Sequence, residues 1–114
     1  MVGLVHWTSD QPLSLPKLRA AMEALPDTVY RAKGIVYLEE LPMYRISMQM
    51  VGKRYDLSDT ERWGSLAPRS EIVLIASRDG IDPDELRRMF EDCIGTGDES
   101  QSPVLRLTRR LELR

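Results

Sequence analysis

The sequence has few of the side chains that enzymes and metal proteins use for chemistry. Its 114 residues contain one histidine, His6, and one cysteine, Cys93. One cysteine cannot form an internal disulfide, and a zinc site needs about four ligands. Nucleophilic catalysis needs a hydroxyl or thiol beside a base, and Cys93 instead falls on an apolar helical pattern. The composition therefore predicts a chain that is not an enzyme by itself, with a reducing, cytoplasmic location.

Positive net charge, long apolar segments and a phosphate-binding loop are also missing. Sixteen Lys and Arg against eighteen Asp and Glu give a net charge of -2, which disfavours nucleic-acid binding through bulk charge. The longest apolar run, Ile72–Ala76, is far shorter than the roughly 20 residues that cross a bilayer. The glycines are scattered rather than clustered before a helix. We expect no nucleic-acid partner and no membrane association.

Hydrophobic periodicity predicts a domain of mixed secondary structure. Period-two or short apolar patterns predict strands over residues 2–9, 29–39, 44–51, 54–57 and 71–77. Helical spacing predicts one helix from Ser14 to just before Pro26, and another from Asp82 to near Gly95. We therefore predict an α+β fold, a two-layer sandwich in which a mainly antiparallel four- or five-stranded sheet carries two helices packed on one face.

Three finer expectations follow from the same patterns. Strict alternation places Tyr30 on the same strand face as Ala32 and Val36. The run Ile72–Ala76 is typical of a central strand covered on both faces. The polar stretch 58–68, which contains Trp63, is predicted to be an exposed loop.

A small basic patch is the main candidate for a contact with a partner. Arg31 and Lys33 share one face of the strand over residues 29–39, and Arg45 lies on the neighbouring strand of the predicted hairpin. Such a patch could dock an acidic surface or a phosphate, although a solvated outer face is the simpler explanation, because charged cross-strand positions are common. His6 and Cys93 are the metal-ligand candidates, although packing explains both, so we predict no metal site in this chain.

Several of these segments together resemble a known family. The order of elements, the pattern Pro12–Ser14 before the first helix, and above all the arginine-x-lysine-glycine pattern within Val29–Leu38 carry the resemblance. It continues through Gln49–Gly52 and Trp63 to the helix that ends near Cys93. The chain resembles the C-terminal domain of CobW-type GTPases, the cobalamin-synthesis-like family of metal chaperones. The family's phosphate loop and metal-binding cysteine motif are absent from these residues, as in an excised or separate C-terminal domain.

The resemblance implies a function that the composition alone does not. It implies a non-catalytic regulatory or client-interaction domain of a GTPase that takes part in metal insertion or homeostasis. GTP, Mg and zinc or cobalt would belong to the full-length protein, and this chain would hold no cofactor. Its partners would be a GTPase domain, in the same or a partner chain, and a metalloprotein client, with Arg31, Lys33 and Arg45 as contact residues.

A second interpretation stays open on the sequence. The chain could be a stand-alone ferredoxin-like interaction or small-ligand-binding module that dimerises through its sheet. Residues 1–97 would form the CobW C-terminal-like domain. Residues 98–114, in which leucines alternate with polar residues, would form a tail. The tail is compatible with an edge strand, with a disordered end, or with a homodimer contact.

Overall fold

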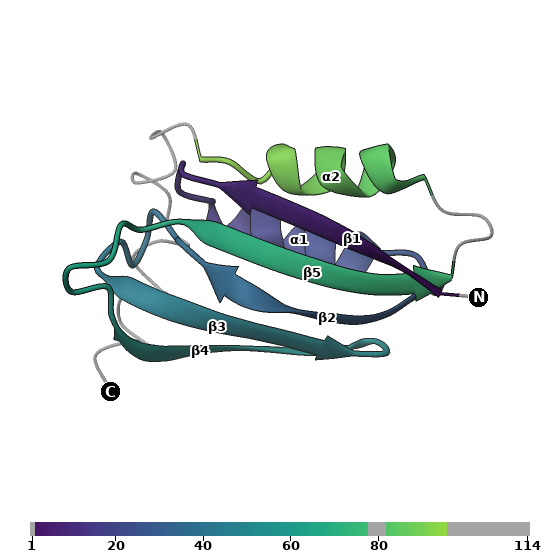
Figure 1. Cartoon of the computed structure of the whole chain (residues 1–114), viewed down its shortest axis with the longest axis horizontal. Coiled ribbons are helices and arrows are strands. Elements are labelled where there is room, and N and C mark those ends of the chain that lie inside the picture. The colour runs from purple at the N-terminus through teal and green to yellow at the C-terminus, as the bar shows by residue number, and fades with distance from the viewer. Residues whose placement is uncertain (1, 78–81, 96–114) are drawn as a thin grey trace.

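Seven elements follow one another in the computed structural model, which describes residues 2–77 and 82–95 (Figure 1). They are β1 (Val2–Ser9), α1 (Leu15–Ala24), β2 (Val29–Val36), β3 (Tyr44–Val51), β4 (Arg54–Arg62), β5 (Ser70–Ser77) and α2 (Pro83–Glu91). The strands form one antiparallel sheet in the order β1-β5-β2-β3-β4. The predicted α+β fold is confirmed. The predicted tail and the end of the predicted domain at residue 97 lie outside the described residues.

Both helices pack on the same face of the sheet, which we call the inner face (Figure 1). Alternate strand residues such as Trp7, Met48 and Leu74 are buried there with the apolar sides of α1 and α2. The Trp7 ring lies 5.8 Å from that of Phe90 on α2, measured between centroids. The opposite, outer face carries no helix in the described part of the chain, and its side chains are exposed or half-buried.

Local side-chain chemistry fixes where the helices begin. Ser14 accepts a hydrogen bond from the backbone N–H of Lys17 at 3.4 Å, and Asp82 accepts one from Asp84 at 3.0 Å. Each helix has a proline in its first turn, where no N–H donor is needed. The buried carboxylate of Glu40 adds a second cap to α1, because both of its oxygens lie 3.0 Å from the N–H of Leu15.

Two of the finer expectations are wrong, each for a non-local reason. Tyr30 is exposed, because a bulge between Val29 and Arg31 in the pairing of β2 with β5 turns it to the outer face. Strand β4 runs to Arg62 rather than residue 57, and Trp63 is buried against Tyr37 instead of lying in an exposed loop. Strand β5 lies inside the sheet, as predicted, and the described residues cover its inner face, so the predicted cover of its outer face stays a prediction.

Some predicted boundaries also differ. Strand β2 ends at Val36 rather than at residue 39, and helix α2 ends at Glu91, before the predicted stop at Gly95. Cys93 and Ile94 therefore follow the helix, and Ile94 makes an isolated bridge to Leu13. This bridge holds the chain after α2 against the segment that precedes α1.

Gly34 sits on β2 where the backbone of β5 leaves no room for a side chain. A Cβ atom at this position would overlap the carbonyl oxygen of Glu71 and lie 2.9 Å from the Cα of Ile72. Both obstacles are backbone atoms, which cannot rotate away as a flexible side chain would. The glycine of the arginine-x-lysine-glycine pattern therefore permits the pairing at the centre of the sheet.

We predict that Gly34→Ala lowers the free energy of unfolding by about 3 kcal/mol, the upper end for overpacking, because backbone must move. Gly52→Ala is the matched control. Gly52 has φ 61° and open space around its Cβ direction, so its cost of about 1 kcal/mol is confined to the left-handed backbone. Urea unfolding of both variants measures the difference. Wild-type stability in Gly34→Ala would disprove the close approach.

Candidate functional site

The outer face of the sheet contains the candidate site, a shallow depression over β2, β3 and β5. Its volume is about 610 Å³. Arg31 and Lys33 lie two residues apart on β2 and share this face, as the alternation predicts. Apolar and polar neighbours complete the outer-face lining, namely Ile35, Gln49, Val51, Glu71, Val73 and Ile75.

Strand register places the two cations in the middle of the sheet. Arg31 lies between Ile75 of β5 and Val51 of β3, and Lys33 lies between Val73 and Gln49. Among the described side chains, neither Arg31 nor Lys33 makes an ion pair. Both are exposed, and the carboxylate of Glu71, which lies beside His6, also lines the depression. The depression therefore presents two cations and one carboxylate to solvent over an apolar floor.

Arg45 stands apart from this pair. It is on the outer face of β3, but it does not line the depression. Its guanidinium Nη1 lies 3.2 Å from Oε1 of Glu61, its cross-strand neighbour on β4. The structure thus brings together two of the three predicted basic residues, and the third is engaged in a surface ion pair.

His6 and Cys93 lie on opposite sides of the sheet. The His6 imidazole is on the outer face, where its Nε2 is 2.9 Å from the carboxylate of Glu71. Cys93 is buried on the inner side, 1% exposed, with Sγ 3.2 Å from the carbonyl oxygen of Met89. Residues 2–77 and 82–95 contain no group of three or more His, Cys, Asp or Glu that could hold a metal ion.

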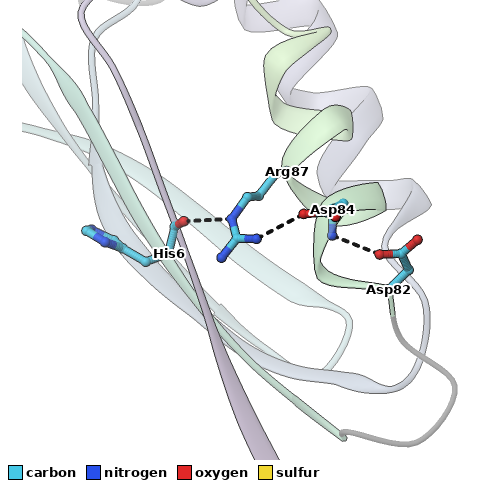
Figure 2. A network of polar contacts seen from close by, with 4 residues as sticks. All are labelled: His6, Asp82, Asp84 and Arg87. Carbon is cyan, nitrogen blue, oxygen red and sulfur yellow. Dashed lines mark hydrogen bonds and ion pairs between the residues drawn. The ribbon is translucent and has the colours of Figure 1, made fainter.

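A polar network ties α2 to the edge strand β1 (Figure 2). The Nε of Arg87 donates to the backbone carbonyl of His6 at 3.2 Å, and Asp84 holds the same guanidinium at 3.3 Å. Asp82 caps the N–H of Asp84. These carboxylates therefore serve the helix start and Arg87, and Arg87 occupies a backbone acceptor on an otherwise open sheet edge.

These features define a class of small domain, an antiparallel sheet with two helices on one face and its other face exposed. No helix in the described part of the chain is long and apolar enough to span a membrane. The sequence matches the family model of the cobalamin synthesis protein CobW C-terminal domain over residues 2–94. The match covers most of the chain, which therefore belongs to the CobW C-terminal domain family.

Two solved structures share the fold. One is a Zn(II)-bound YjiA GTPase from E. coli, with a TM-score of 0.72, and the other is a Zn(II)-bound triple mutant of YjiA GTPase, with a TM-score of 0.73. Each is 22% identical to this chain, and each likeness covers 82% of this chain but 30% of the YjiA chain. The chain thus spans less than a third of the length of these relatives. No curated protein matches the sequence.

The burial of Cys93 leads to a prediction about its reactivity. Burial raises the pKa of the Cys93 thiol to about 11, with the nearby charge of Asp92 acting in the same direction. At pH 8 only about one thiol in a thousand is then ionised, and the thiolate is the nucleophile. We expect a maleimide to label the native protein at least about 100-fold more slowly than the urea-unfolded protein. Equal rates would show that Cys93 is accessible.

Proposed function

We propose that this chain is the non-catalytic accessory domain of a CobW-type GTPase, and that it contacts the GTPase domain or a metalloprotein client through its outer sheet face. The observation that carries the proposal is the pair of exposed cations, Arg31 and Lys33, within a domain that belongs to the CobW C-terminal family. Both fall within the family's arginine-x-lysine-glycine pattern.

In this proposal, nucleotide hydrolysis and metal binding are carried out by residues outside this chain. GTP, Mg and the delivered metal, zinc or cobalt, would bind outside this chain, consistent with its core cysteine and single exposed histidine. The zinc-bound state of the YjiA GTPase supports a role in metal handling for the whole protein. The domain would then contribute recognition, in the cytoplasm, by a surface that adds nothing to hydrolysis itself.

Regulation would require that the contact differ between nucleotide states. A ligand shifts a conformational equilibrium only through its differential affinity for the two states. In this proposal the outer face binds one nucleotide state of the GTPase domain more tightly, so that GTP hydrolysis changes which surface is free for the client. The β2–β5 pairing fixes the backbone positions of Arg31 and Lys33, which limits the backbone part of the ordering cost of the contact.

The test is a double charge reversal, Arg31→Glu with Lys33→Glu. We expect this variant of the chain to bind a CobW-type GTPase domain at least about tenfold more weakly than wild type in the preferred nucleotide state. Wild-type binding should also weaken as salt is raised. Calorimetric titrations with GDP and with a non-hydrolysable GTP analogue measure both effects.

Arg69→Glu with Arg88→Glu is the matched control. It changes the net charge by the same amount at two exposed positions outside the depression. The control should bind as wild type does. If both double variants kept wild-type affinity in both nucleotide states, Arg31 and Lys33 would have no part in the contact.

A further inference from the structure

An apolar row crosses the outer face at the level of Arg31. Strand register aligns Leu4 of β1 with Ile75 of β5, Ile75 with Arg31 of β2, and Arg31 with Val51 of β3. Residues aligned in this way share one face of the sheet. Leu4 is 71% exposed and Val51 is 59% exposed. We call Leu4, Ile75 and Val51 the apolar row.

The next row continues the same surface. Val73 lies beside Lys33, so each of the two cations has a branched apolar side chain of β5 as its cross-strand neighbour. Val73 and Ile75 are half-buried and form the floor of the depression. The surface therefore has apolar side chains at its base, with the two long cationic side chains of Arg31 and Lys33 beside them.

The composition of β5 indicates that another molecular surface packs on this floor when the protein functions. A strand with one face in water normally alternates apolar and polar residues, whereas Ile72–Ala76 is apolar throughout. The described helices cover only the inner members of this run. The outer members of the run would be covered by something outside the described residues.

The charges that line the depression indicate what kind of molecule covers it. The depression carries two cations against one carboxylate, Glu71, which His6 already engages, so a second copy of this chain centred on it would bring together two surfaces with an excess of positive charge, which is unfavourable. Nucleic acid would meet only two cations on a chain of net charge -2, and its phosphates would gain nothing from the apolar row. A protein surface with carboxylates around an apolar contact satisfies both parts of the depression.

We propose that the apolar row and the Arg31–Lys33 pair together bind an acidic, apolar-centred surface of the GTPase domain. The inference rests on the proposed function and adds the chemistry of the partner surface. The stems of Arg31 and Lys33 lie along the floor while their charged ends meet carboxylates at its rim. Desolvation of the apolar row around Arg31 strengthens that ion pair relative to one on an open surface.

The test separates the apolar contact from the charged one by binding of the intact chain to a CobW-type GTPase domain. Val51→Ser removes an apolar side chain that is 59% exposed, and Leu66→Ser, at 60% exposure outside the depression, is the matched control. Arg31→Leu removes the charge but keeps apolar bulk. We expect Val51→Ser and Arg31→Leu each to weaken binding by about fivefold or more, and Leu66→Ser to leave it unchanged.

Each other outcome contradicts the inference in a distinct way. Tighter binding by Arg31→Leu would mean that the partner surface is purely apolar. Wild-type affinity in Val51→Ser, with a loss in Arg31→Leu, would mean that the GTPase domain recognises the charge alone and that the apolar row has no part in the contact. Failure of the wild-type chain to bind in either nucleotide state would overturn the contact with the GTPase domain, which is the part of the proposed function on which the inference rests. Circular dichroism of each variant shows that a loss of binding is not a loss of fold.

Discussion

The close approach of β2 to β5 at Gly34 is the constraint on which the rest of the structure depends. It joins the β1–β5 pair to the β2–β3–β4 meander, so that five strands form one sheet. The same contact fixes the register that puts Arg31 and Lys33 beside Ile75 and Val73. A side chain at position 34 would separate the strands where the candidate site lies. The glycine of this pattern therefore permits the strand pairing, while the arginine and lysine lie exposed on the outer face.

The two faces of the sheet have different tasks. The inner face and the helices bury the apolar residues that hold the domain together, and Cys93 belongs to this core. Caps from Ser14, Glu40 and Asp82 satisfy the helix starts with side chains from both near and far in the sequence. Among the described residues, the outer face contributes little to the core. It carries Arg31 and Lys33, which make no ion pair with a described side chain. In this member of the CobW C-terminal domain family, the described residues thus form one apolar core on the helix-covered side of the sheet and leave the other side exposed.

Features that depend on near neighbours were predictable from the sequence, and features set by distant pairing were not. The Ser14 cap and the shared face of Arg31 and Lys33 follow from spacings of a few residues, and the structure has both. The exposure of Tyr30 depends on a bulge defined by the pairing with Ile75 and Ala76 of β5, which are far from Tyr30 in the sequence, and periodicity contains no sign of it. The pairing of Arg45 with Glu61 required β4 to continue past its predicted end. The family resemblance correctly identified the domain, because it rested on the same local patterns.

Protection of the outer face tests the central claim most directly. Gln49 is exposed and lines the depression, so Gln49→Cys places a reactive thiol there. Cys93 is buried and its pKa is raised, so a maleimide should label the introduced cysteine much faster than Cys93. The labelling rate is measured with and without a CobW-type GTPase domain in each nucleotide state. Our account predicts that labelling slows markedly when the GTPase domain binds, and more in one nucleotide state than in the other. An unchanged rate in a demonstrated complex would show that the partner binds elsewhere.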